Sequence, residues 1–229
     1  MAFTTPVASV SAGSPDKNTF TSSAIDTTGA NLIVVGISDE TGTQVFSDSK
    51  SNTWTHLTSA NGFGSLYSRI AYCASPTVGS GHTFTLTGTN VAMSFNVDAW
   101  AGADSAPFDQ ENGEGNSLGP TIEPGPVTPT TDNQLIVTHL IDISGTDASI
   151  DDGFTNSGDE PAEANACFQS ALAYLVQTTA AASDPSWSPV NIGAATIATF
   201  KAAAAAAGQP TTKRFGGVPF MALPGRGNV

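Results

Sequence analysis

The sequence is poor in charge, and poorest in basic residues. Only 12% of its 229 residues are charged, with 7 Lys and Arg against 20 Asp and Glu, about half the usual charged share. The formal net charge of −13 argues against nonspecific nucleic-acid binding, because phosphate neutralisation requires Lys and Arg. The low charge also argues against long solvent-exposed helices, which usually carry Glu and Lys. A neutral polar surface with many turns is typical of a β-sandwich.

Long apolar runs are also missing. No stretch approaches the ~18 apolar residues of a membrane span, so we expect no membrane partner. The N-terminal segment has no basic residue before Lys17 and no apolar run of signal-peptide length, so we expect no Sec-type export from the cytoplasm where the chain is made. Cys73 and Cys167 are the only cysteines. They either pair or, as a reducing compartment favours, are two buried small hydrophobes.

What the sequence does contain is a second copy of itself. Residues 27–34 (TTGANLIV) reappear 103 residues later as residues 130–137 (TTDNQLIV). The match continues further along the chain, with Trp54 matching Phe154, Tyr72 matching Tyr174 and Trp100 matching Phe200. A repeat of this length indicates two copies of one supersecondary unit rather than a solenoid. We therefore expect half-repeats at about residues 27–101 and 130–201, which share one core within a domain of residues 1–201.

Period-two alternation bounded by Gly, Pro, Asn and Asp predicts strands in both halves. The first series covers residues 20–25, 32–38, 53–57, 65–73, 82–87 and 91–100, and the second covers 121–123, 135–143, 170–178 and 194–201, with a weaker candidate near Trp187. In residues 65–72, Leu66 and Ile70 share one face while Tyr67 and Arg69 share the other, which predicts a dry face and a wet face. Residues 162–173 also have helical spacing, so a helix remains an alternative there.

Two segments are expected to connect or extend these elements. Residues 101–130, rich in Gly, Pro and acid, are expected to form a crossover with one short strand. Residues 202–210 begin with six alanines and end in Gly-Gln-Pro, which indicates a linker. Residues 1–184 carry a net charge of −17, whereas the remainder carries four basic residues and no acidic one. The acidic body therefore ends in a basic, extended tail, residues 211–229.

This tail holds too much apolar surface to remain in water without a reason. One interpretation is that the tail covers an edge strand of its own domain. The other is that it extends to a neighbouring subunit, where basic residues meet acidic surface and phenylalanines fill pockets. The candidate partner-binding residues are Lys213, Arg214, Phe215, Val218, Phe220, Met221, Leu223 and Arg226.

Patterns that suggest catalysis or metal binding are incomplete. Residues 115–119 (GNSLG) fit the G-x-S-x-G expression, but the prolines that follow prevent the helix that a nucleophilic Ser117 requires. His56, His82 and His139 lie on three predicted strands without neighbours at metal-ligand spacing. Loop carboxylates near residues 39–48 and 151–160 are candidates for calcium or for a glycosidase pair, but turn-forming Asp is the favoured interpretation. We therefore predict no catalytic residue, no metal site and no cofactor.

The aromatic residues suggest one binding hypothesis. Trp54 and Trp100 match Phe154 and Phe200 in the repeat, which indicates core positions used in both halves. Tyr67 and Trp187 are the freer side chains, and they are the candidate glycan-binding residues.

Several of these segments resemble a known module. Residues 47–55 (SDSKSNTWT), the strand that ends at Tyr72, and residues 97–104 with the following Pro107-Phe108-Asp109 resemble a β-sandwich module of tailed-phage virion proteins and bacterial surface proteins, over about residues 25–201. The start of the tail, residues 213–217 (KRFGG), is similar to endings of small phage structural proteins. The resemblance brings no catalytic residues.

The resemblance implies a virion component, namely a jelly-roll-type capsid decoration or cement protein. Such a protein would be a homo-oligomer, with a trimer favoured, and its partner would be the major capsid protein or another virion protein. The alternative is a glycan- or receptor-binding module of a phage tail fibre or baseplate.

Overall fold

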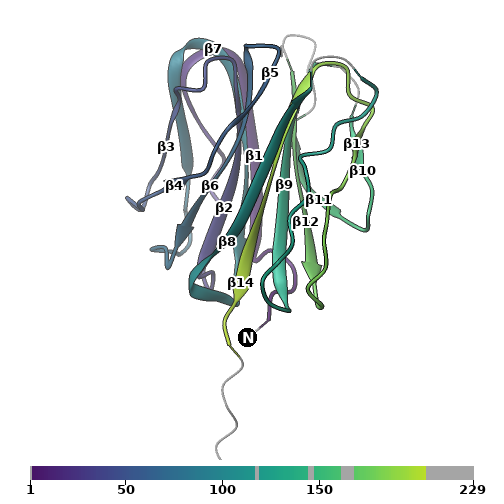
Figure 1. The fold of residues 1–229 in the computed structure, drawn as a ribbon. Helices are drawn as coiled ribbons and strands as arrows, with labels where there is room; N and C mark the ends of the chain where they lie inside the picture. Colours follow the sequence, from purple (N-terminus) through teal and green to yellow (C-terminus); the bar gives the residue numbers. More distant parts are fainter. Residues whose placement is uncertain (1, 117–118, 144–146, 161–167, 205–229) are drawn as a thin grey trace, which may run out of the picture.

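The computed structural model describes residues 2–116, 119–143, 147–160 and 168–204 (Figure 1). All regular elements of these residues are β-strands, and all their pairings are antiparallel. The strands are β1 (Ala8–Thr21), β2 (Leu32–Asp39), β3 (Val45–Asp48), β4 (Thr55–His56), β5 (Ala60–Gly62), β6 (Leu66–Ala74), β7 (Phe84–Trp100), β8 (Ala103–Asn116), β9 (Gln134–Asp142), β10 (Ser149–Ile150), β11 (Thr155–Glu160), β12 (Gln169–Gln177), β13 (Trp187–Ser188) and β14 (Gly193–Ala202). The predicted all-β antiparallel sandwich built from two similar halves is confirmed.

Each half of the chain forms one main sheet, and the strand order is the same in both main sheets, while β10 and β13 pair as a separate two-stranded sheet. The first sheet has the order β1-β7-β2-β6-β4, with β3 added to β7 and β5 added to β6, and the second has the order β8-β14-β9-β12-β11. The registers also agree. Leu32 lies opposite Trp100 and Ala74, and its repeat equivalent Leu135 lies opposite Phe200 and Val176. The repeat seen in the sequence is therefore preserved at the level of individual residue pairs.

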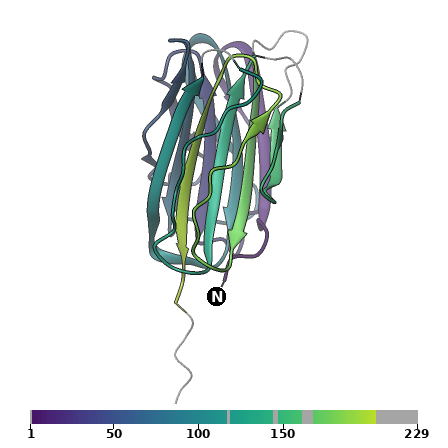
Figure 2. The same ribbon diagram turned by 45° about the vertical axis from the view of Figure 1, so that its right-hand side comes forward.

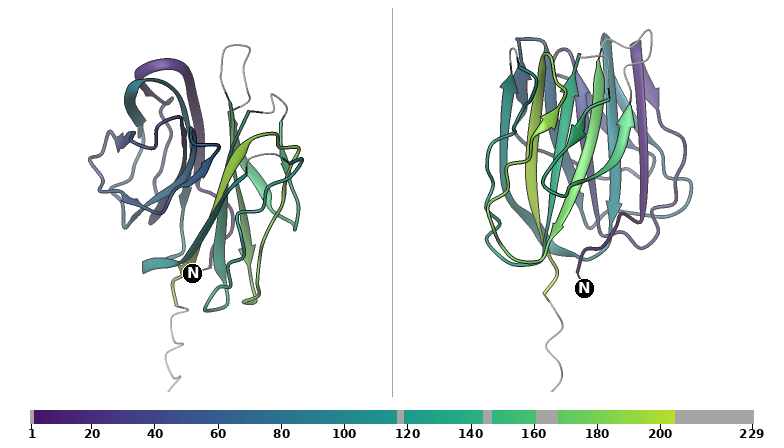
Figure 3. Two further views of the ribbon diagram at one scale, coloured as in Figure 1. Left: turned by 45° about the horizontal axis from the view of Figure 1, so that its top comes forward. Right: turned by 90° about the vertical axis from the view of Figure 1, so that its right-hand side faces the viewer.

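The two sheets pack face to face, as the views in Figures 2 and 3 show. Strand β1 lies against β11, β7 against β12, β2 against β9, β6 against β14, and β5 against β8. Exchanging each strand for its equivalent in the other half reproduces this set of contacts, because β5 lies on the same side of β6 as β4. The sheets are thus related by a pseudo-two-fold axis that passes through the contact between β2 and β9.

The sheets are buried on both faces. Between them, an apolar cluster formed by both halves includes Leu32, Trp100, Leu135 and Phe200. On its outer face, each sheet is covered by its own connecting segments. Phe46 of β3 belongs to the cluster over the first sheet, and Trp187 of β13 belongs to the cluster over the second sheet. Every residue of β2 and β9 is buried as a result, and the alternation of dry and wet positions survives only in part, over Leu66–Ile70 of β6.

Several elements differ from the sequence prediction. Strand β1 covers Ala8–Thr21, although a strand was expected only over residues 20–25. Strand β8 runs for 14 residues through the segment where a crossover with one short strand was expected. Strand β7 is continuous over 17 residues, although its sequence predicts two separate strands. The alternative of a helix over 162–173 is wrong for its described part, because residues 169–173 lie in β12, whereas residues 161–167 lie outside the described residues. Residues 205–229, which include all candidate residues of the tail, also lie outside them.

At the centre of the sandwich, one imidazole ring takes the space of a missing side chain. Gly36 of β2 and His139 of β9 are equivalent positions of the repeat, 103 residues apart, and they face each other across the two sheets. A Cβ atom at Gly36 would lie 2.1 Å from Cδ2 of His139. Two hydrogen bonds hold the ring, one between its Nδ1 and the Ser68 hydroxyl, 2.9 Å, and one between its Nε2 and the Ser38 hydroxyl, 3.3 Å. The spacing of the sheets therefore depends on glycine at position 36.

We expect Gly36→Ala to lower the free energy of unfolding by at least about 1–3 kcal/mol, the usual cost of overpacking a core. His139→Ala will also destabilise the protein, but the double variant should be more stable than the sum of the two effects predicts, because the clash is gone. Urea titrations of the unsubstituted protein, the two single variants and the double variant measure the coupling free energy between the two positions. Strictly additive effects would contradict the contact between Gly36 and His139.

Candidate functional site

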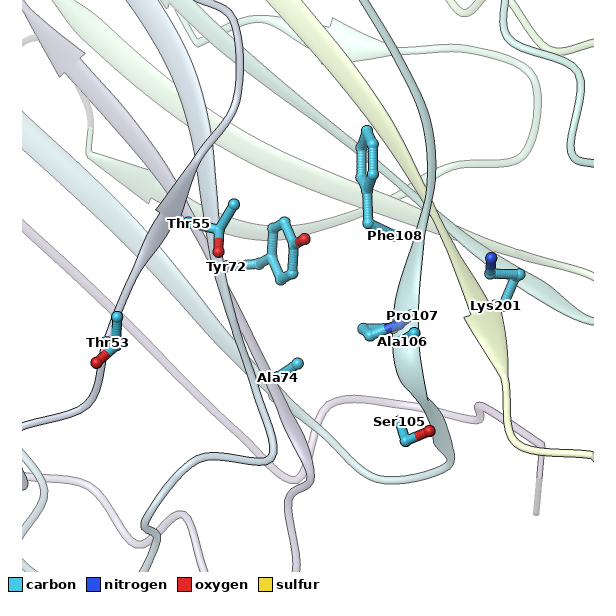
Figure 4. A pocket seen from close by; sticks show the side chains of 9 residues that line it. All are labelled: Thr53, Thr55, Tyr72, Ala74, Ser105, Ala106, Pro107, Phe108 and Lys201. Atoms are coloured by element: carbon cyan, nitrogen blue, oxygen red, sulfur yellow. The ribbon is translucent and has the colours of Figure 1, made fainter.

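A groove of about 350 Å³ opens along one edge of the sandwich, between β4 and β6 of the first sheet and β8 and β14 of the second (Figure 4). Its walls combine the rings of Tyr72, Pro107 and Phe108 with small hydroxyl side chains and with Lys201 of β14. The lining residues come from four segments that are distant in the sequence. The groove exists only because the two halves meet there.

Core packing holds the aromatic side chains of the groove in place. The rings of Tyr72 and Phe108 are nearly parallel, with centroids 5.9 Å apart and an interplanar angle of 12°. Tyr72 also meets the fully buried Phe200 edge to face at 5.4 Å. Its repeat equivalent Tyr174 meets Trp100 in the same way at 4.8 Å. The rings of the groove are therefore ordered in advance of any ligand, which lowers the entropy cost of binding.

Towards the other end of the sandwich, the same edge is closed. The carboxylate of Glu111 on β8 accepts hydrogen bonds from the backbone N–H of Thr58, at 2.9 Å, and from its hydroxyl, at 3.0 Å. Beyond this bridge the two sheets approach at their glycines, since a Cβ at Gly115 would lie 1.8 Å from the carbonyl oxygen of Asn61. The edge is thus open at Tyr72 and Phe108 and sealed at the far end.

A second exposed surface lies at that far end. Phe63 follows β5 and is 67% exposed, with a positive φ of 53°. Ile143, which follows β9, is 38% exposed and lines a small hollow with Phe63 and Ile192. Asn61 fixes the turn by accepting a hydrogen bond from the N–H of Gly64 at 2.9 Å. This apolar surface is therefore displayed on a constrained turn.

The contact between the sheets also contains a buried polar seam, formed by Ser38, Ser68, Asn96, Asp98, His139, Ser170 and Thr196. Two of its hydrogen bonds are repeat equivalents: the hydroxyl of Ser68 bonds that of Thr196 at 2.9 Å, and the hydroxyl of Ser170 donates to the side-chain oxygen of Asn96. His139 is completely enclosed, and this burial lowers its pKa to about 3. Its ring therefore stays neutral and serves packing rather than proton transfer with solvent.

Asp98 is the acidic member of the polar seam. Burial raises the pKa of Asp98 to about 6, although hydroxyls of Ser157 and Ser9 act in the opposite direction. The Ser9 hydroxyl donates to its Oδ1 at 2.7 Å, whereas its Oδ2 is buried without a hydrogen-bond partner. This carboxyl group is the one titratable side chain of the seam whose pKa rises.

The loop over residues 47–55 is organised by Asp48. Its carboxylate accepts hydrogen bonds from the indole N–H of Trp54 at 2.9 Å and from the backbone N–H of Lys50 at 2.7 Å, and it contacts Nε2 of His82 at 3.1 Å. The side chain of Asn52 adds a further bond at 3.2 Å. Asp48, Asn52 and Trp54 therefore have a structural role: their hydrogen bonds shape the loop and hold Trp54 against the core.

The expected pair of glycan-binding aromatics is not formed. Trp187 is fully buried, and its indole N–H donates to the Thr138 hydroxyl at 3.2 Å. Its ring belongs to the apolar cluster over the second sheet, so it has no face for a sugar. Tyr67 is half-buried on the outer side of the first sheet, where its ring contacts Gly42. The two side chains lie on opposite sides of the sandwich, so the prediction of Trp187 as an exposed stacking residue is wrong.

The other residues considered for chemistry have structural partners. Asp39 caps its own turn by accepting hydrogen bonds from the backbone N–H groups of Thr41 and Gly42. Asp151 accepts the N–H of Ser186 at 2.7 Å. Within the described ranges, no group of three or more His, Cys, Asp and Glu is arranged to hold a metal ion. Cys73 is buried, whereas Cys167 and Ser117 lie outside the described residues.

Comparisons with known proteins give no relative. No protein-family model, no curated protein and no solved structure matches this chain. In the part of the chain that the structure describes, no helix is long and apolar enough to cross a membrane.

The buried carboxyl of Asp98 generates a prediction about pH. Because its pKa is about 6 in the folded state and near 3.8 when unfolded, the folded protein holds more protons between these values. Stability attributable to Asp98 therefore falls as pH rises through this window, by about 3 kcal/mol for two pKa units. His139, with its lowered pKa, acts in the opposite direction between about pH 3 and 6.5.

We expect the unfolding free energy of Asp98→Asn, relative to the unsubstituted protein, to increase by about 2 kcal/mol between pH 4 and pH 7, since part of the total change falls below pH 4. The contribution of His139 is common to both proteins and cancels in this difference. Urea titrations at one-unit intervals of pH measure the effect. A difference that stays constant over this range would show that Asp98 is not protonated in the folded state.

Proposed function

We propose that this protein is a structural component of a phage particle, a capsid decoration or cement protein that stabilises the shell through contacts between subunits. The observation that carries the proposal is the division of charge along the chain. Residues 1–184 have a net charge of −17, whereas residues 205–229 contain three basic residues and no acidic one. A body and a tail of opposite charge favour association between copies of one chain.

The geometry of the sandwich supports this role. Strand β14 ends at one end of the sandwich, next to the N-terminal segment (Figure 1). Its last residues remain bound to the body, since the N–H of Ala203 donates to the carbonyl of Gly102 at 2.8 Å. A tail that starts from a fixed end of a rigid body is well placed to reach a neighbour on a shell.

The tail has sufficient apolar surface for such a contact. Full burial contributes about 1.5–3 kcal/mol for each large apolar side chain, and the tail carries Phe215, Val218, Phe220, Met221 and Leu223. At about 1–2 kcal/mol for each residue fixed, this gain is comparable with the cost of ordering the apolar part of the tail, residues 215–223, rather than the whole tail. Capsid stabilisation depends on many such modest contacts repeated by symmetry, in a homo-oligomer such as a trimer.

The alternative is a glycan- or receptor-binding module of a tail fibre or baseplate. This hypothesis depended on Tyr67 and Trp187 as a pair of exposed aromatic residues. With Trp187 enclosed, the two candidate stacking residues do not share a surface. The decoration role is therefore the better supported of the two.

A chain truncated after Gly208 tests the contribution of the tail. We expect its melting temperature to remain within about 2 °C of that of the full chain, because less than 1 kcal/mol of body stability should be lost. We also expect it to lose oligomerisation or attachment to the particle, measured by light scattering and by sedimentation with particles. The full-length variant Phe215→Ser, Phe220→Ser is the matched control, since it keeps length and charge.

Unfolding of the truncated sandwich with assembly left intact would instead make the tail an intramolecular edge cover. Mass spectrometry of purified particles tests the location. Absence of the protein from the particle would contradict the proposed function.

A further inference from the structure

The groove at Tyr72 and Phe108 lies beside the place where the chain leaves the sandwich. Lys201 lines the groove, and β14 ends one residue later. At this point Ala202 is still paired with Ala103, so the last described residues of β14 remain bound to β8. The tail is therefore joined to the sandwich close to the groove.

Strand β8 presents a free edge to the groove. It pairs with β14 on one side, and no strand of the described residues pairs with it on the other. Glu111 and Thr58 join the two sheets further along this edge, whereas Ser105, Ala106, Pro107 and Phe108 of β8 line the groove. Free edges of this kind accept extended segments, and exposed aromatic rings beside them supply pockets for side chains.

The charge of β8 is complementary to that of the tail. Strand β8 carries Asp104, Asp109, Glu111 and Glu114 and no basic residue. The single cation at the groove, Lys201, is electrostatically coupled to Asp109, whose pKa it helps to lower. The segment 211–229 brings Lys213, Arg214 and Arg226 with six large apolar side chains, two of them phenylalanines, and it carries no acidic residue. A segment with basic and aromatic side chains is the chemistry that this edge fits.

We propose that the groove between Tyr72 and Phe108 is the acceptor site for the C-terminal segment, residues 211–229, of a neighbouring copy of this chain. The segment lies in extended form along the free edge of β8, with phenylalanines against the two rings and basic residues towards the acidic side chains. This inference rests on the proposed function, because it names the surface through which the tail bridges subunits. Fully extended, the 19 residues of the segment span at most about 65 Å, more than the length of β8.

Photocrosslinking in the full-length protein tests the site. A benzophenone amino acid replaces Phe215, and isotopically light and heavy chains are mixed before irradiation. We expect crosslinked peptides that join position 215 to residues 66–74 or 103–116, with light–heavy pairs present. As a control, the same photoreactive residue at Phe63, on the exposed apolar surface at the far end, should give no crosslink to the tail.

Each other outcome overturns the proposal. Crosslinks to Phe63, Ile143 or Ile192 would place the tail on the far surface. Light–light and heavy–heavy pairs alone would show that the segment docks on its own sandwich. Neither result depends on whether the protein occurs in a phage particle, so failure of the inference is distinguishable from failure of the proposed function.

A pair of substitutions at one exposed position tests the charge argument without disturbing the core. Ser105 lines the groove and is exposed. We expect Ser105→Arg to reduce the light–heavy crosslink yield by about threefold or more and Ser105→Glu to leave it unchanged or raise it, since electrostatics steers association. Equal yields in both variants would contradict a basic ligand. Saturable binding of a neutral oligosaccharide, lost in Ser105→Arg, would assign the groove to a saccharide and also overturn the proposal.

Discussion

The contact between Gly36 and His139 sets the geometry on which the rest of the sandwich depends. The two positions are equivalent in the repeat and meet at the pseudo-two-fold axis, so two large side chains cannot occupy both. Glycine on β2 admits the whole imidazole of β9, and hydroxyls of Ser38 and Ser68 satisfy both ring nitrogens. A buried polar ring is costly unless its hydrogen bonds are made, so this central contact also fixes the register of the two sheets.

The two halves make similar contacts on the inner faces of their sheets and different contacts on the outer faces. The inner face repeats its contacts, as the pairs Tyr72–Phe200 and Tyr174–Trp100 show. On the outer faces, the indole of Trp54 bonds Asp48 over the first sheet, whereas the indole of Trp187 bonds Thr138 over the second. The inner face is constrained because each half must fit the other. The outer loops and edges are free of this constraint, and the groove at Tyr72 lies where such an edge meets the shared interior.

Much of the fold could be predicted from the sequence, because the repeat aligns the central strands β2, β6, β9, β12 and β14 with apolar patterns. The full lengths of strands β1 and β8 were not predicted. Both strands lie at sheet edges, where small and charged residues such as those of β8 are tolerated, so their sequences lack the apolar alternation of a central strand. The position of Trp187 could not be foreseen, because its burial depends on connecting segments that cover the outer face of the second sheet. No local sequence pattern predicts the groove, because its lining residues come from four segments that are distant in the sequence.

The division of the protein into a closed body and an attached basic segment has an energetic consequence for assembly. Association has a free-energy cost because translational and rotational freedom are lost. The binding free energy of a single short segment exceeds this cost by only a little. Here the receiving rings are already ordered by the core, because Tyr72 packs on the buried Phe200. The remaining conformational-entropy cost is that of ordering the segment. Weak contacts of this kind become effective when many copies are held on one lattice, because every further contact is then formed at high effective concentration. In the proposed role, a body whose stability does not depend on the segment would exchange neighbours without unfolding, as a component that adds to a shell already assembled requires.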